Sequence, residues 1–210
     1  WRSLEGLSAS DPQRRAQAAA DFIEEVREGL SLDHARLTAR VEGRGETVKH
    51  TALQNTSGRA RSLSAPQGSV LKGVLLEINP SGRCALLKAM SLLSVEELRA
   101  SPWEELARAG LDDPTPKVRQ SAAQLLSAHP LCAPEELTAR LDAEEVYFVR
   151  ASLILALGRA CPEEPQRSLK ALDVWEAGAA ARGLSLGDKE REALSKARSA
   201  LTALAPSALS

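Results

Sequence analysis

The sequence predicts a mainly helical protein whose second half consists of repeated helical hairpins. Aromatic residues make up only 3% of the 210 residues. Ala and Leu are abundant, which suits helices that pack through small and branched aliphatic side chains better than it suits a β core. Two pairs of motifs also recur at one offset of 31 residues: Glu104-Glu105 with Glu135-Glu136, and Val118-Arg119 with Val149-Arg150. A shared offset indicates a repeated structural unit.

The N-terminal segment, residues 1–36, is expected to be helical. Ser10-Asp11-Pro12 supplies a capping side chain followed by proline in the first turn. Apolar residues then recur at helical spacing, and Gly29 ends the run. A second, shorter helical segment follows Ser31.

Residues 37–79 have a different character, because Thr and Val become frequent and Gly43-Arg44-Gly45 forms a turn signal. Short strands are predicted at residues 40–42, 46–53 and 60–63, which together would make a small β-meander. Residues 69–78 fit a strand by composition and a helix by length. The alternative for the whole segment is a Ser/Thr/Gly-rich ordered linker.

Charge is distributed unevenly along the chain although the net charge is only −1. Residues 96–145 are acidic, whereas residues 36–72 are basic. A basic patch of this kind can attract an acidic partner. The candidate binding residues are therefore the basic ones of this segment: Arg40, Arg44, Lys49, Arg59 and Arg61.

Residues 80–210 are predicted to form helical repeats with capping helices at the C-terminal end. Pro80-Ser81-Gly82 opens a helix with apolar residues at helical spacing up to Leu93. Each repeat then begins with a Glu pair, turns through acidic residues and opens its second helix with Val-Arg. The last two helices, about 163–181 and 188–204, are more polar and rich in Ala, as terminal repeats need to be.

The turn and second helix of the first repeat carry Asp113-Pro114, Val118-Arg119, Ala122 and Leu125. With these residues the chain resembles the HEAT-repeat family of α-solenoids over about residues 80–160. The next unit keeps Val149-Arg150 but has Glu144-Glu145 in place of Asp-Pro. The resemblance implies a stack of antiparallel helical hairpins that is used for binding, and it implies no particular reaction.

Stacked hairpins must cover their apolar faces, so Val118 and Val149 are expected to be buried at equivalent positions. Arg119 and Arg150 are expected to lie near the turns, where acidic residues of adjacent units can accept their hydrogen bonds. These four residues are the predicted structural signature of the repeat.

Motifs that could carry chemistry have simpler explanations. Gly183 to Gly187 matches the G-x-S-x-G nucleophile elbow, but a helical segment precedes it and no histidine follows it in the chain, so a loop between helices is expected. His129 and Cys132 have no second ligand pair, and a structural zinc site needs four ligands. We therefore predict no catalytic residue, no metal site and no cofactor.

Two other motifs suggest alternatives. Trp103 and Trp175 could line the concave face of a HEAT-like DNA glycosylase, but residues 96–145 are acidic and DNA binding needs a basic track. Arg59 to Pro66 matches a basophilic kinase site at Ser64, a kind of match that is weak without structural context.

The function expected from the sequence is that of a non-catalytic solenoid module that binds another macromolecule, most plausibly a protein. The alternatives are nucleic-acid binding through residues 36–72, a glycosylase relative, or an accessory domain of a larger enzyme. The three scattered cysteines fit a reducing compartment, no apolar run is long enough to span a bilayer, and no signal peptide is visible in the sequence as it begins at Trp1. We therefore expect an intracellular, cytoplasmic location, and the missing Met favours an excised or processed fragment.

Overall fold

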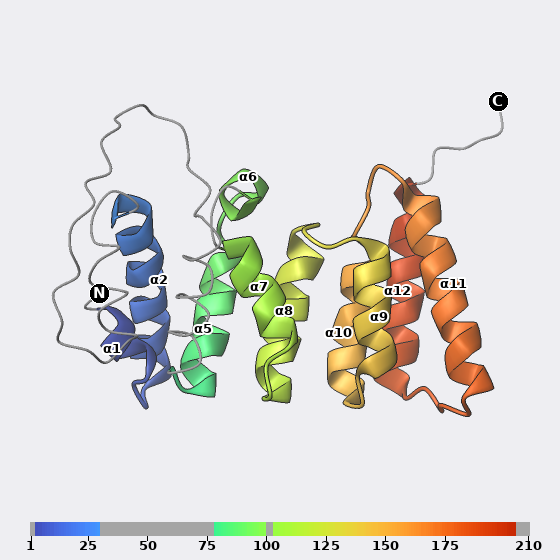
Figure 1. Ribbon diagram of the computed structural model, residues 1–210, viewed down its shortest axis with the longest axis horizontal. Coiled ribbons are helices and arrows are strands. Elements are labelled where there is room, and N and C mark those ends of the chain that lie inside the picture. Colours follow the sequence, from blue (N-terminus) through green and yellow to red (C-terminus); the bar gives the residue numbers. More distant parts are fainter. Residues whose placement is uncertain (1–2, 30–77, 100–102, 205–210) are drawn as a thin grey trace, which may run out of the picture. The chain divides into compact units, whose positions relative to one another are not determined.

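The computed structural model describes residues 3–29, 78–99 and 103–204, and within these ranges the protein is mainly helical with no strand (Figure 1). The β-meander expected at residues 37–79 falls outside the described residues except for Ile78 and Asn79, which belong to no strand. The chain divides into two compact units, residues 1–109 and 110–210. The repeat stretch expected at residues 80–210 therefore crosses this division.

The first unit contains α1, α2, α5, α6 and most of α7, with bounds Ser3–Leu7, Pro12–Gly29, Pro80–Met90, Val95–Arg99 and Trp103–Leu111. α1, α2 and α5 contact one another. Phe22 of α2 and Trp103 of α7 meet edge to face with ring centroids 6.3 Å apart. The expected helix from Pro80 ends at Met90 rather than Leu93, because Ser94 and Glu97 form a reciprocal capping box that starts α6.

Gly82 allows α5 to begin directly against the end of α1. A Cβ atom at this position would lie 2.2 Å from the carbonyl oxygen of Leu7. The side chain of Asn79 caps α5 by accepting a 2.8 Å hydrogen bond from the Gly82 amide. The side-chain amide of Asn79 also donates to the carbonyl of Ser8, so this side chain links the start of α5 to the segment that follows α1.

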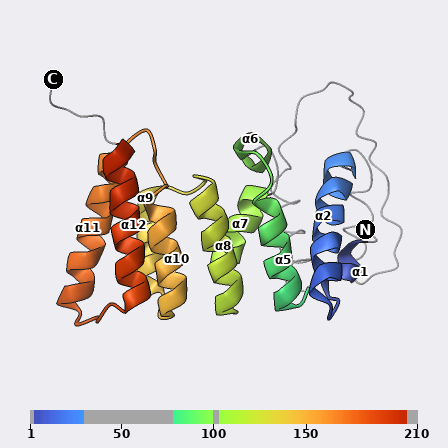
Figure 2. The same ribbon diagram turned by 180° about the vertical axis from the view of Figure 1, so that it is seen from behind.

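The second unit contains α8 to α12, with bounds Pro116–Ala128, Pro134–Ala143, Tyr147–Leu157, Pro165–Ala181 and Asp188–Leu204. α10 contacts both α8 and α12, and α9 contacts α11. The unit thus has two layers, with α8, α10 and α12 in one and α9 and α11 in the other, as the two opposite views show (Figures 1 and 2).

The core of the second unit lies between its two layers and is built almost entirely from aliphatic residues and one indole. Val118, Leu153, Ile154 and Leu172 are at most 2% exposed, and so is Trp175. Gly158 at the end of α10 lets this helix approach α12 closely, because a Cβ there would lie 2.6 Å from the Cβ of Ala197. None of the helices in the described part of the chain combines the length and apolarity needed to cross a membrane.

Candidate binding site

The two signature valines occupy the same place in α8 and α10. Val118 is the third residue of α8 and Val149 the third residue of α10, and each side chain is 1% exposed. Each amide donates to the carbonyl three residues earlier, at 3.0 Å in both cases. The burial predicted for these two valines is confirmed.

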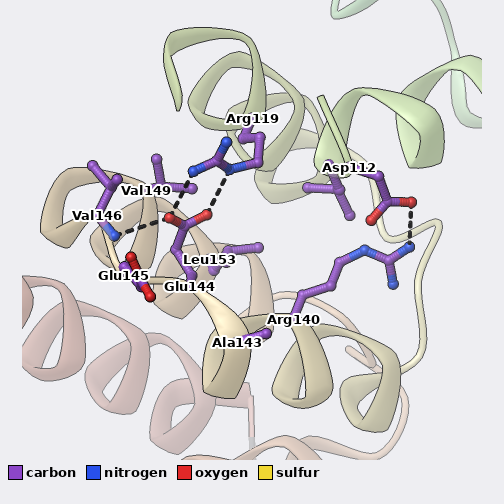
Figure 3. Close-up of a pocket in the computed structure, with 10 residues that line it drawn as sticks. Asp112, Arg119, Arg140, Ala143, Glu144, Glu145, Val146, Val149 and Leu153 are labelled. Atoms are coloured by element: carbon purple, nitrogen blue, oxygen red, sulfur yellow. Dashed lines mark hydrogen bonds and ion pairs between the residues drawn. The ribbon is translucent and has the colours of Figure 1, made fainter. Parts of the chain in front are cut away.

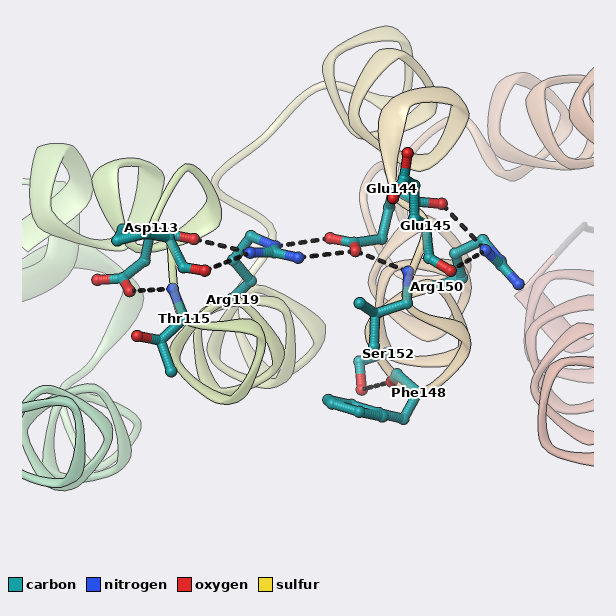
Figure 4. Close-up of polar contacts among 10 residues, drawn as sticks. Asp113, Thr115, Arg119, Glu144, Glu145, Phe148, Arg150 and Ser152 are labelled. Carbon is teal, nitrogen blue, oxygen red and sulfur yellow. Dashed lines mark hydrogen bonds and ion pairs between the residues drawn. The ribbon is translucent and has the colours of Figure 1, made fainter.

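The arginine that follows each valine makes the same backbone contacts (Figure 4). Nη1 of Arg119 donates to the carbonyls of Asp113 and Pro114 at 2.9 and 3.2 Å. Nη1 of Arg150 donates to the carbonyls of Glu144 and Glu145 at 3.1 and 2.7 Å. In both helices these are the carbonyls six and five residues earlier, so each guanidinium closes the turn that precedes its own helix.

Each arginine also contacts a carboxylate farther along the chain, Glu144 at the end of α9 or Glu190 in α12. Nε and Nη2 of Arg119 bind the two carboxylate oxygens of Glu144 at 2.7 and 2.9 Å. Nε of Arg150 lies 2.6 Å from Oε1 of Glu190. Acidic residues accept these bonds, as expected, although the sequence analysis identified neither glutamate as the acceptor.

The side chain of Glu144 caps the start of α10 in the same way that the side chain of Asp113, 31 residues earlier, caps the start of α8. Oδ1 of Asp113 accepts from the Thr115 amide at 2.8 Å, and Oε1 of Glu144 accepts from the Val146 amide at 2.9 Å. Both pairs span two residues, so the longer Glu side chain substitutes for the Asp of the Asp-Pro turn. Glu144-Glu145 before α10 therefore preserves the cap that Asp113-Pro114 provides before α8.

The electrostatics of the first pair follow from these contacts. Burial alone would raise the pKa of Glu144, but the hydrogen bonds from Arg119 and from the Val146 amide, together with the charges of both arginines, lower it below its ordinary value. The hydrogen bond to Glu144 raises the pKa of Arg119. Both side chains are therefore charged at neutral pH.

Three further arginines repeat the backbone contact, and of these only Arg83 could be suspected from the sequence as the equivalent residue of an earlier, degenerate unit. Each is the fourth residue of its helix, as Arg119 and Arg150 are, and each donates from Nη1 to the carbonyl five residues earlier: Arg15 in α2, Arg83 in α5 and Arg191 in α12. A spacing of Pro-x-x-Arg marks three of the five: Pro12 to Arg15, Pro80 to Arg83 and Pro116 to Arg119. This spacing was the available signal.

A pocket of about 300 Å³ lies beside the Arg119–Glu144 pair, within the second unit (Figure 3). Val146, Val149 and Leu153 of the α9–α10 turn and α10, with Leu111, give it apolar walls, and Asp112, Arg140 and Glu145 add charge. Arg140 is held weakly, because its nearest contacts to Asp112 and Glu136 are both 3.3 Å long. The Nε atom of Arg140 is buried and makes no hydrogen bond within the described part of the chain.

The other sequence-predicted candidates are placed as follows. The basic patch, Arg40, Arg44, Lys49, Arg59 and Arg61, lies outside the described residues, as does Ser64. Trp103 and Trp175 are 3% and 1% exposed, so neither indole can form a concave aromatic surface for a flipped base. The glycosylase alternative loses the two residues on which it depended.

The nucleophile-like and ligand-like motifs occupy ordinary structural positions. Gly183 to Gly187 connects α11 and α12, and Gly183 adopts a positive φ of 72°. His129 is the C-terminal cap residue of α8. Across the described ranges, no group of three or more His, Cys, Asp or Glu residues is arranged to hold a metal ion.

A scan against protein-family models and searches among curated proteins and solved structures found no match to this chain.

Proposed function

We propose that this chain is a non-catalytic interaction module of the HEAT-like α-solenoid kind, and that its second unit binds another protein. Support for the repeat assignment comes from the two-layer packing of α8 to α12 and from contacts that recur at one offset. The hydroxyl groups of Ser121 and Ser152 add one more such pair, since each donates to the carbonyl four residues earlier at 3.1 Å.

The observation that carries the binding proposal is the pocket beside Arg119 and Glu144. It combines apolar walls with charged groups at its edge, which is the composition that recognises a side chain of specific shape and charge. The pocket lies where α8, α9 and α10 meet, so a protein that fills it also contacts the surrounding turns.

The chemistry of the pocket favours recognition over catalysis. Its lining contains no Ser, Cys or His. Glu144 is held in a bidentate ion pair and its pKa is lowered, whereas a general acid or base works best with a pKa near the operating pH. The carboxylate is thus a fixed negative charge rather than a proton carrier.

The experiment that tests this proposal is affinity capture from native lysate followed by hydrogen-exchange mass spectrometry of the full chain with the purified captured protein. We expect saturable binding and slower exchange in residues 110–149, which contain the pocket. Saturable binding that protects only other parts of the chain would contradict the proposal.

A second candidate, nucleic-acid binding, is favoured by the clustering of Arg40, Arg44, Lys49, Arg59 and Arg61 in the sequence. A labelled oligonucleotide titrated at two salt concentrations separates the two candidates. Phosphate contacts release counterions, so binding of this kind weakens steeply as salt rises from about 50 to about 200 mM. A partner protein that docks in the pocket of the second unit does not require such a dependence.

A further inference from the structure

We infer that the pocket between α8, α9 and α10 receives the guanidinium group of an arginine in a basic segment of the partner protein. This inference rests on the proposed function and specifies the chemistry of the partner. It follows from the charge that remains unneutralised, from the shape of the pocket and from the weak contacts of Arg140.

The pocket has an excess of negative charge. Its lining contains the carboxylates of Asp112, Glu144 and Glu145 but only the two cations Arg119 and Arg140. The guanidinium group of Arg119 already donates hydrogen bonds to Glu144 and to two backbone carbonyls. The carboxylate of Glu145 is exposed and joins no ion pair with any described residue, so it is available to a cation from outside.

The apolar wall matches the other part of an arginine side chain. Val146 is partly exposed and offers aliphatic surface beside the charged edge, whereas Val149 and Leu153 line the same pocket but are only 1% and 2% exposed. Arginine buries its methylene stem on such surface while its head group stays with polar partners. Its planar fork also binds a carboxylate through two parallel hydrogen bonds, which an ammonium group cannot do. The volume of about 300 Å³ is enough to admit an arginine side chain.

Arg140 must move when the partner's arginine enters. Its 3.3 Å contacts with Asp112 and Glu136 contrast with the 2.7 Å contact between Arg119 and Glu144. The side chain of Asp112 is 60% exposed. A second guanidinium can therefore replace Arg140 at Asp112, and Arg140 competes with the ligand instead of assisting it.

The test is titration of the full chain with the peptide acetyl-Gly-Gly-Arg-Gly-Gly-amide, followed by calorimetry and by amide chemical shifts. Peptides with Lys or with uncharged citrulline in place of Arg are the ligand controls. We expect saturable binding of the Arg peptide, weaker binding of the Lys peptide, no binding of the citrulline peptide and shifts in residues 111–112 and 143–149.

Three variants of the full chain decide the outcome. Glu145→Gln should weaken binding about tenfold, the loss expected when a charge-assisted hydrogen bond is removed. Glu163→Gln makes the same charge change at an exposed residue outside the pocket and should leave binding within about twofold. Arg140→Ala should tighten binding, because it removes the competing cation.

Equal weakening by Glu145→Gln and Glu163→Gln would overturn the inference, because binding would then reflect overall charge. Weaker binding of the Arg peptide to Arg140→Ala would overturn it as well, since Arg140 would then assist the ligand rather than compete with it. Shifts in residues 36–72 caused by Glu145→Gln without peptide would identify this chain's own basic segment as the occupant and would exclude the partner. If the captured protein binds Glu145→Gln as tightly as it binds the unmodified chain, only this inference fails, whereas absence of any saturable protein partner refutes the proposed function itself.

Discussion

Arg150 and Glu190 form a buried ion pair that joins α10 to α12. Nε of Arg150 lies 2.6 Å from Oε1 of Glu190, and the two side chains are 8% and 1% exposed. The other oxygen of Glu190 accepts from the Gly187 amide at 2.8 Å. One carboxylate thus caps its own helix and receives the arginine of the preceding hairpin, as Glu144 does for Arg119.

Removal of Glu190 should destabilise the second unit strongly. Glu190→Ala leaves the guanidinium of Arg150 buried with no carboxylate partner, and breaking a buried pair in this way costs about 3–5 kcal/mol. Urea unfolding of the full chain at pH 7, followed by circular dichroism, measures the change. Glu192→Ala is the matched control, because its pair with Lys196 is exposed and should contribute little. Equal effects of the two substitutions would show that the buried pair has no special role.

The equivalence of Val118 and Val149 predicts equal sensitivity to charge. Val118→Asp and Val149→Asp each place an unpaired carboxylate in an apolar interface and should each lower the free energy of unfolding by several kcal/mol, roughly 3 or more. Val174→Asp makes the same change at a valine that is 61% exposed. Its effect should stay within about 0.5 kcal/mol. Thermal unfolding of the three variants gives the comparison, and tolerance of either buried substitution would refute the predicted core.

The close contact of α10 with α12 can be tested by adding a single methyl group. Gly158→Ala pushes a Cβ against Ala197 and should cost about 1–3 kcal/mol through overpacking. Gly178→Ala, inside α11, meets only the flexible end of Arg182 at 3.5 Å and should stabilise by about 0.5–1 kcal/mol. Opposite signs in urea unfolding are expected. If both substitutions stabilise the chain, the two helices are not in tight contact.

Low pH should reduce the free energy of unfolding, partly because Glu144 becomes protonated. Because folding lowers the pKa of this carboxyl group, its stabilising contribution is complete above its ordinary value of roughly 4.3 and is lost as the pH falls through the lower folded-state value. Glu144→Gln should therefore be less stable than the unmodified chain at pH 7. The difference should shrink below about pH 4, where the carboxyl group becomes protonated.

Urea unfolding of both proteins between pH 7 and pH 3 measures this dependence. Glu163→Gln, at an exposed residue with no ion pair to the described residues, should run parallel to the unmodified chain. A constant difference between Glu144→Gln and the unmodified chain at every pH would contradict the assignment.

The recurrence of Val118-Arg119 as Val149-Arg150 could be recognised in the sequence because the contacts of these residues are with residues close to them in the chain. Val118 and Val149 follow their turns at a fixed distance, and the arginines bind carbonyls only five and six residues earlier. A turn that needs the same local contacts requires the same residue types at the same spacing from the helix start. Helix positions were predictable for the same reason, since Pro80, Pro116 and Pro165 begin helices in the structure.

The acceptors of these arginines and the pocket could not be derived from the sequence. Glu144 is 25 residues from Arg119, whereas Glu190 is 40 residues from Arg150, so no single spacing identifies them. Glu190 also lies in the first turn of the last helix, where its carboxylate accepts from the Gly187 amide, and does not belong to a Glu pair. The pocket is formed where the start of α8, the end of α9 and the start of α10 come together. That arrangement is set by the packing of the helices rather than by a local sequence pattern.

The most direct test of the central claim is hydrogen-exchange mass spectrometry on the full chain in complex with its captured protein partner. We expect slower exchange concentrated in residues 110–149, and loss of that protection in Ala143→Trp, which places an indole at an exposed residue that lines the pocket. Protection that is confined to other residues, or that persists unchanged in this variant, would contradict the claim that the second unit binds its partner at this pocket.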